Sequence, residues 1–217
     1  MKYLILKLQG AMQAWGAHTY EDLRPTNLFP TRSGVVGLLG ACLGIERKDI
    51  QARKALSAGL VMAVRADDRT EWKPQIITDY HTVLDARKVD GKARKNAILS
   101  SREYLCDAEY TIALTLEKIE IKLKKLITAV QKPYYTPVLG RKSCPLHRPL
   151  YEAEVEAESL SDALAQVAPY QGTIYSDTPM TGASVLEIRD VPLLSQIREF
   201  GRRKVYVLGY GGKNVSK

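Results

Sequence analysis

Residues 75–105 carry a cluster of cations between two apolar and aromatic segments, and this chemistry suits the binding of an anion. The basic side chains are opposed only by Asp85 and Asp90; they are Arg87, Lys88, Lys92, Arg94 and Lys95. Asp90 and Gly91 form a dipeptide typical of tight turns, so the segment is predicted to be a β-hairpin with a basic tip. A projecting cationic hairpin is suited to a nucleic-acid phosphate backbone. The alternative is a solvated loop without a ligand.

A second basic segment, residues 132–148, also contains aromatic side chains. Its members are Lys132, Tyr134, Tyr135, Arg141, Lys142 and Arg148. Tyrosine rings stack on splayed bases while guanidinium and ammonium groups follow the phosphates, which is what recognition of single-stranded RNA requires. The alternative is a proline-rich crossover whose tyrosines pack on the core.

Catalysis is a weaker hypothesis than binding. Metal-free RNA cleavage needs a base, an acid and a cation, and the candidates for the first two are His18, His81 and His147. The sequence does not show that any two of them converge, so each is predicted to be a contact rather than a catalyst. Glutamates at 152, 154, 156 and 158 lie roughly 6.6 Å apart along a strand, too far for one metal ion. We therefore expect no enzyme, metal or cofactor; a metal-independent endoribonuclease and a general nucleic-acid chaperone remain alternatives.

The basic composition of the chain favours a polyanionic partner, and a nucleic acid more than an anionic membrane. The chain has 217 residues and a formal net charge of +8. No stretch approaches the ~20 apolar residues of a membrane-spanning helix, and the first ten residues read as a strand rather than a signal peptide. Three widely spaced cysteines form no CxxC pair. A cytoplasmic protein without a membrane partner is expected.

The elements that would position these segments follow an α+β order. Strands are predicted at 3–9, 60–66, 110–116, 151–158, 173–176, 185–189 and 204–208, and helices at 34–44, 49–58, 117–131 and 160–167. Ser33 is predicted to cap the first helix, where Arg32 and free backbone N–H groups would form a phosphate seat. Strand, helix, strand, hairpin, strand and helix is the order of a ferredoxin-like unit, the fold of RNA-recognition motifs. Residues 1–150 would form this domain, with the hairpin at about 76–105, and 151–217 a small β-rich subdomain.

Several segments together resemble the CasD family of type I-E Cascade, the CRISPR surveillance complex that carries a guide RNA. The resemblance rests on LQGAMQAWG, RPTNLFPTRSGVVGLLGACLGI, DYHTVLDAR, SREYLCDAEYTIAL and YTPVLGRKSCPLHRPL, and extends to about residue 151. It implies a RAMP-type fold with a thumb hairpin that binds and caps the 5′ handle of the crRNA. It also implies a non-catalytic subunit beside the backbone subunit CasC and the large subunit CasA, with target DNA reached through the assembled complex. A related subtype uses a Lys-His pair for cleavage, and no adjacent Lys-His occurs here.

The resemblance also implies roles for individual residues. Gln13 and Trp15 would lie close to the handle, and Arg24, Arg32 and Ser33 would hold its phosphates. His81 and Arg102 at the base of the thumb would guide the RNA toward the spacer, and Arg87 and Lys88 belong to the basic thumb. Tyr135, Arg141 and Lys142 would contact handle bases and backbone.

Overall fold

The fold is built on one antiparallel sheet. The structure, a computed structural model, describes residues 1–68, 74–86, 91–92, 96–118, 121–193 and 199–209. The seven strands run in the order β10-β1-β9-β6-β11-β13-β12. Their bounds are β1 Lys2–Gln9, β6 Leu60–Asp67, β9 Glu109–Leu116, β10 Tyr151–Glu156, β11 Gly172–Ser176, β12 Ser184–Pro192 and β13 Phe200–Leu208. Every pair of neighbours in it is antiparallel.

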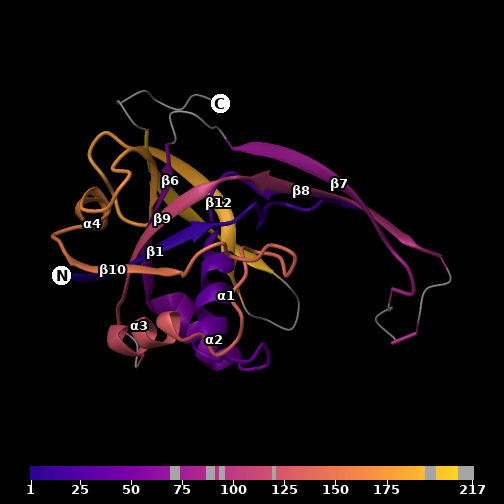
Figure 1. Cartoon of the computed structure of the whole chain (residues 1–217), viewed down its shortest axis with the longest axis horizontal. Coiled ribbons are helices and arrows are strands. Elements are labelled where there is room, and N and C mark those ends of the chain that lie inside the picture. The colour runs from indigo at the N-terminus through magenta and orange to yellow at the C-terminus, as the bar shows by residue number, and fades with distance from the viewer. Residues whose placement is uncertain (69–73, 87–90, 93–95, 119–120, 194–198, 210–217) are drawn as a thin grey trace.

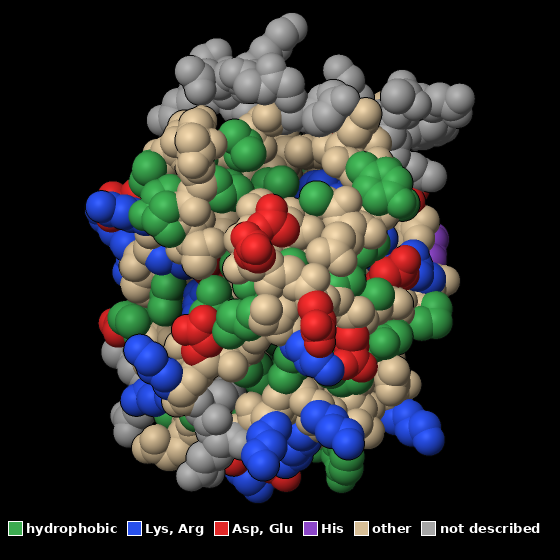
Figure 2. All heavy atoms as spheres, turned by 90° about the vertical axis from the view of Figure 1, so that its left-hand side faces the viewer, with side chains coloured by type: hydrophobic (Ala, Val, Ile, Leu, Met, Phe, Trp, Pro, Cys, Tyr) green, Lys and Arg blue, Asp and Glu red, His purple; other side chains and the backbone are tan. Residues whose placement is uncertain are grey.

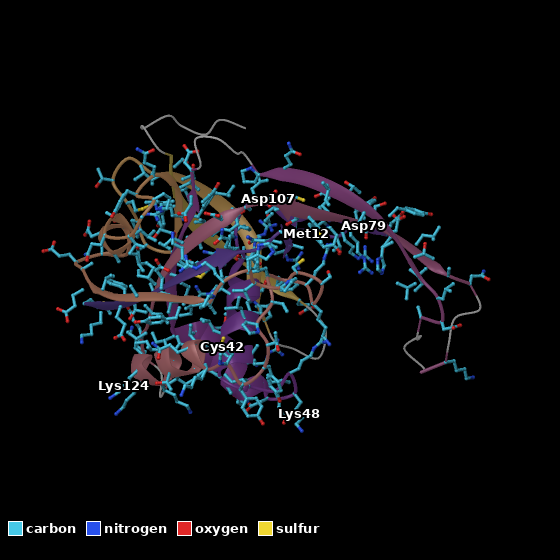
Figure 3. The ribbon with its side chains drawn as sticks, viewed as in Figure 1. Met12, Cys42, Lys48, Asp79, Asp107 and Lys124 are labelled. Carbon is cyan, nitrogen blue, oxygen red and sulfur yellow. The ribbon has the colours of Figure 1, made fainter. Side chains whose placement is uncertain are left out.

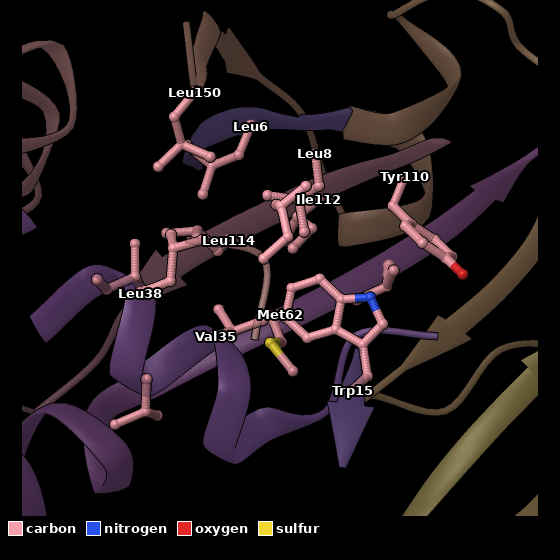
Figure 4. Close-up of a cluster of buried hydrophobic side chains, with 14 of the residues drawn as sticks. Leu6, Leu8, Trp15, Val35, Leu38, Met62, Tyr110, Ile112, Leu114 and Leu150 are labelled. Carbon is pink, nitrogen blue, oxygen red and sulfur yellow. The ribbon is translucent and has the colours of Figure 1, made fainter. Parts of the chain in front are cut away.

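Helices cover both faces of this sheet. Three lie on one side, α1 Arg32–Cys42, α2 Ile50–Gly59 and α3 Leu123–Gln131, and the short α4 Leu160–Ala165 contacts the other (Figure 1). Leu4, Leu6 and Leu8 of β1 point toward the larger core with α1 and α3, and Figure 4 shows Leu6 and Leu8 there. Tyr3 and Ile5 point to the smaller cluster with α4. This period of two is what a strand buried on both faces requires.

A second, smaller sheet supports a hairpin that projects from the body. Strands β7 Gln75–Val83 and β8 Ile98–Cys106 form the hairpin, and Figure 1 shows it extending to the right, away from the helices. β8 also pairs with β2 Met12–Gln13 and, in parallel, with β4 Leu23–Arg24. Strands β3 Trp15–Gly16 and β5 Thr26–Asn27 form a separate pair. The first loop is therefore fastened to the base of the hairpin.

Most predicted elements are confirmed, with two corrections at helix starts. Thr31, not Ser33, caps α1: its side-chain oxygen accepts from the N–H of Gly34 at 3.3 Å. α3 begins at Leu123 rather than at residue 117. Apolar spacing identifies a helix better than it places the first turn, because capping depends on the local backbone.

The last third of the chain continues the same sheet. β10 is the edge strand beside β1, and β11 pairs with β6, so β13 and β12 extend the sheet beyond β6. The division into two domains at residue 150 stays a prediction, but the strands of both parts form one hydrogen-bonded layer. Among the described residues, no helix is long and apolar enough to span a membrane.

Candidate nucleic-acid interface

A cleft of about 660 Å³ opens where the hairpin joins the body. We call it the hairpin-base cleft; its lining residues are Met12, Ile77, Asp79, His81, Arg102, Tyr104, Arg141, Lys142 and Ser143. Figure 3 shows Met12 where the hairpin joins the body and Asp79 farther out along the hairpin. Four of the residues assigned to RNA binding from the sequence converge here, namely His81, Arg102, Arg141 and Lys142.

The hairpin contributes one face of its two strands to the cleft. Residues directly opposite on antiparallel strands share a face. Ile77 lies opposite Tyr104, and Asp79 lies opposite Arg102. On the other side of β8, Arg24 is the parallel partner of Arg102. Strand alternation therefore places an aromatic ring, two arginines and a carboxylate along one surface.

Arg141 is the most firmly held cation of the cleft. Its Nη1 donates to the carbonyl oxygen of Glu103 and its Nη2 to that of Arg24, each at 3.1 Å. The guanidinium carbon lies 4.5 Å from the centre of the Tyr104 ring, which is a cation–π contact. Since both acceptors are backbone carbonyl oxygens, these bonds fix the geometry of Arg141 without pairing it with a carboxylate.

The other cations are held less tightly. Arg102 Nε donates to Ser100 Oγ at 3.1 Å, and Lys142 is exposed. His81 Nδ1 lies 3.6 Å from Asp79 Oδ2. Arg102, Arg141 and Lys142 thus line the same cleft as a single carboxylate, that of Asp79, and positive charge exceeds negative charge on this surface. Figure 2 shows the left-hand side of Figure 1, the side away from the hairpin, and on that face acidic and basic side chains are interspersed.

Gly140 allows Arg141 to reach this position. Gly140 has a φ of +87°, and a Cβ at this position would lie 1.8 Å from the carbonyl oxygen of Ala14. Ala14 N–H in turn donates to the carbonyl oxygen of Leu139 at 3.1 Å. The backbone before Arg141 is therefore pressed against the first loop, and only glycine fits.

We expect Gly140→Ala to destabilise the fold by about 2 kcal/mol, because it adds a left-handed backbone penalty to a backbone clash. Urea unfolding measures this loss. Gly182→Ala is the matched control: Gly182 has a φ of +77° but no atom within 4 Å of the added Cβ. Equal losses for the two variants would contradict the close approach at Ala14.

Gln13 and Trp15 are core residues rather than surface contacts. Both are fully buried. Gln13 Nε2 donates to the carbonyl oxygen of Ala108 at 2.6 Å, and its Oε1 accepts from Trp15 Nε1 at 3.1 Å. Their side chains are therefore fully used inside the protein, and we assign them the positioning of the first loop. An aromatic residue in a long loop signals packing, but the sequence does not show on what.

The predicted phosphate seat at the start of α1 is wrong. Arg32 backbone N–H donates to Asp190 Oδ2 at 2.7 Å, so the chain supplies its own anion there. The Arg32 guanidinium is buried and donates to Asp177 and to the carbonyl oxygens of Ser57 and Leu60. A pattern read along the chain could not find carboxylates that are more than 140 residues away.

The remaining predicted residues are not among the described lining residues of the hairpin-base cleft. Tyr135 is 45% exposed and its N–H donates to the carbonyl oxygen of Ala41, at the end of α1. Arg24 Nη1 donates to its neighbour Leu23, and the Arg24 carbonyl is the one that holds Arg141. Ser33 is partly buried beside Thr31. Arg87 and Lys88 lie outside the described residues, so their roles stay predictions.

Five lining residues of the cleft were not predicted from the sequence, namely Met12, Ile77, Asp79, Tyr104 and Ser143. Asp79 and Tyr104 are the two of them that can be traced to a sequence signal. The signal that identifies them is strand alternation: each lies two residues from a predicted contact, His81 or Arg102, on the same face. The histidines are not gathered for catalysis. His147 Nε2 accepts a hydrogen bond from the N–H of Ala11 at 3.2 Å, and His18 is exposed. His81 is the only histidine among the described lining residues of the cleft.

Three comparisons with known proteins agree with each other. Residues 3–206 match the family described as CRISPR-associated protein (Cas_Cas5). A curated protein of Escherichia coli (strain K12), CRISPR system Cascade subunit CasD, is 45% identical over 222 residues, which cover 99% of each chain. A chain of a solved CRISPR RNA-guided surveillance complex superposes with a TM-score of 0.76 at 26% identity, covering 96% of this chain and 90% of that one. A solved structure described as a Cas protein gives a TM-score of 0.64 at 27% identity, covering 97% and 100%.

Proposed function

Because the chain belongs to the CRISPR-associated Cas5 family, we propose that it is the Cascade subunit that binds and caps the 5′ handle of the crRNA. The observation that carries this proposal is the hairpin-base cleft, where sequence-distant cations meet an aromatic ring. Its backbone-subunit and large-subunit neighbours would be CasC and CasA, and target DNA would be reached through the complex. We propose a cytoplasmic location for this assembly.

The fold assigned to this function is a ferredoxin-like, RAMP-type domain with a thumb. Support comes from the strand order β10-β1-β9-β6, in which α1 and α2 connect β1 to β6 and α3 connects β9 to β10. This is the order of a split βαβ unit. The β7–β8 hairpin, inserted between β6 and β9, is the proposed thumb.

The cleft chemistry suits a single strand rather than a duplex. Arg102 and Lys142 would bind phosphate oxygens, and Arg141 with Tyr104 provides flat surfaces on which an unpaired base can stack. General acid–base cleavage of RNA is not favoured, because His81 has no second histidine beside it among the described lining residues. We therefore assign binding without catalysis.

We expect the purified protein, with EDTA present, to retain a labelled CRISPR repeat RNA in preference to a length-matched scrambled RNA, without cutting it. A single gel reads both binding and cleavage. Retention of both RNAs alike would identify a general chaperone, whose affinity is set mainly by salt. A single specific cut that disappears in His81→Ala would overturn the capping role in favour of the endoribonuclease.

A further inference from the structure

A carboxylate in the middle of a phosphate-binding cleft calls for an explanation. Asp79 lines the hairpin-base cleft together with Arg102, Arg141 and Lys142. Its side chain is 48% exposed. A carboxylate repels phosphate and so weakens binding to the RNA backbone. What it does well is accept hydrogen bonds, because an ionised carboxylate is an acceptor only.

Within the described part of the chain, Asp79 forms no ion pair with Arg102, the cation directly opposite it on the neighbouring strand. Arg102 lies directly opposite Asp79, yet Arg102 Nε donates to Ser100 Oγ at 3.1 Å. His81 Nδ1 lies 3.6 Å from Asp79 Oδ2, which is longer than a hydrogen bond. Among the described residues, Asp79 therefore makes no side-chain hydrogen bond to Arg102 or to His81, and its oxygens keep the capacity to accept hydrogen bonds from a ligand.

The surroundings of Asp79 suit a planar base. Ile77, on the same strand face, and Met12 supply apolar surface. Tyr104 and Arg141 supply an aromatic ring and a guanidinium plane whose orientation two backbone carbonyls fix. The volume of about 660 Å³ lies in the range of small-molecule pockets. A nucleotide can thus enter with its base against these surfaces and its phosphate at the cations.

Given binding of the crRNA handle, on which this step rests, we propose that Asp79 reads a guanine of the handle through its Watson–Crick edge. Guanine presents two adjacent donors there, N1–H and the N2 amino group, which match the two oxygens of one carboxylate. Adenine and cytosine place a single amino group beside an acceptor, which would face a carboxylate lone pair. Uracil places one N–H between two acceptors. Asp79 is thus the specificity-determining residue of the cleft.

The test uses the full-length protein and fluorescently labelled RNAs with the sequence of the host's own CRISPR handle, in which each position is in turn guanine, adenine, cytosine or uracil. We expect one position where guanine binds about tenfold more tightly than the other bases. Inosine at that position lacks the N2 amino group and should weaken binding to the wild-type protein. In Asp79→Asn both preferences should disappear.

Asp68→Asn is the matched control, because it removes the same charge from an exposed residue outside the cleft lining. It should preserve the guanine preference. A uniform gain in affinity for all four bases in Asp79→Asn would overturn the base-reading role and leave a purely repulsive charge. If Asp79→Asn binds the handle RNA with the same base preference as the wild type, the base-reading role is also overturned, while the capping function stands. No binding of any handle RNA by the wild type would instead remove the capping function itself.

Discussion

The double variant Arg102→Ala/Lys142→Ala is expected to bind the handle RNA roughly 100-fold more weakly than the wild type, since each lost charge-assisted contact to phosphate costs about 1.5 kcal/mol. Both side chains line the hairpin-base cleft. Neither is needed for the core: Lys142 is exposed and Arg102 is only partly buried. Fluorescence polarisation over a range of salt concentrations measures the loss.

Salt dependence identifies the mechanism behind this loss. Removing two phosphate contacts on a single strand should reduce the slope of log affinity against log salt by about 1.4. The control is Lys124→Ala/Lys125→Ala, which removes two exposed cations from α3 and installs a good helix former. Figure 3 shows Lys124 far from the hairpin. If the α3 variant weakened binding as much, net charge and not the cleft would explain affinity.

The framework of the fold was largely predictable because it depends on local periodicity. The strand at 3–9 alternates between two cores, and the tight-turn signal at Gly91 lies between β7 and β8, as a hairpin requires. Helix starts were less accurate, since Thr31 caps α1 in place of Ser33. The joining of β11 to β6 was not predicted, because antiparallel partners distant along the chain leave no mark in either strand alone.

The site was predictable only where its residues had a recognisable local signature. Arg141 and Lys142 were predicted as contacts because basic and aromatic residues alternate around them, and both line the hairpin-base cleft. Asp79 was not singled out, because the sequence alone does not show that it lies opposite Arg102 on the neighbouring strand. The phosphate seat predicted at Arg32 was wrong for a different reason. A cation at a helix start suggests a site for a bound anion, but in the folded chain Asp177 and Asp190 supply the anionic groups there.

These two carboxylates belong to a buried ion cluster that joins α1 to the end of the sheet. Asp177, after β11, accepts from Arg32 of α1, from Arg203 of β13 and from the N–H of Met62 in β6. Asp190 of β12 accepts from Arg203 Nε at 2.7 Å. Burial alone would lower the pKa of Arg203, but its hydrogen bonds and ion pairs with Asp190 and Asp177 reverse this, and its pKa is raised. Arg203 therefore stays protonated in the buried cluster.

Asp177→Ala is expected to destabilise the protein by about 3–5 kcal/mol, because it leaves Arg32 and Arg203 buried with one carboxylate between them. Their side chains are only 11% and 13% exposed. Urea unfolding measures the loss. The control, Glu187→Ala, removes a carboxylate from an exposed pair with Arg202 and should cost less than about 1 kcal/mol. Equal losses would mean that burial of the pair is not what matters.

The same variant tests whether Arg32 has any part in the interface. Neither Arg32 nor Asp177 lines the hairpin-base cleft. At a temperature where Asp177→Ala is still folded, its affinity for the handle should therefore equal that of the wild type. A marked change in affinity with the fold intact would show that the Arg32 guanidinium, which Asp177 holds, influences RNA binding. Unchanged affinity would mean that Asp177, with Arg32 and Arg203, stabilises the fold without contributing to RNA binding.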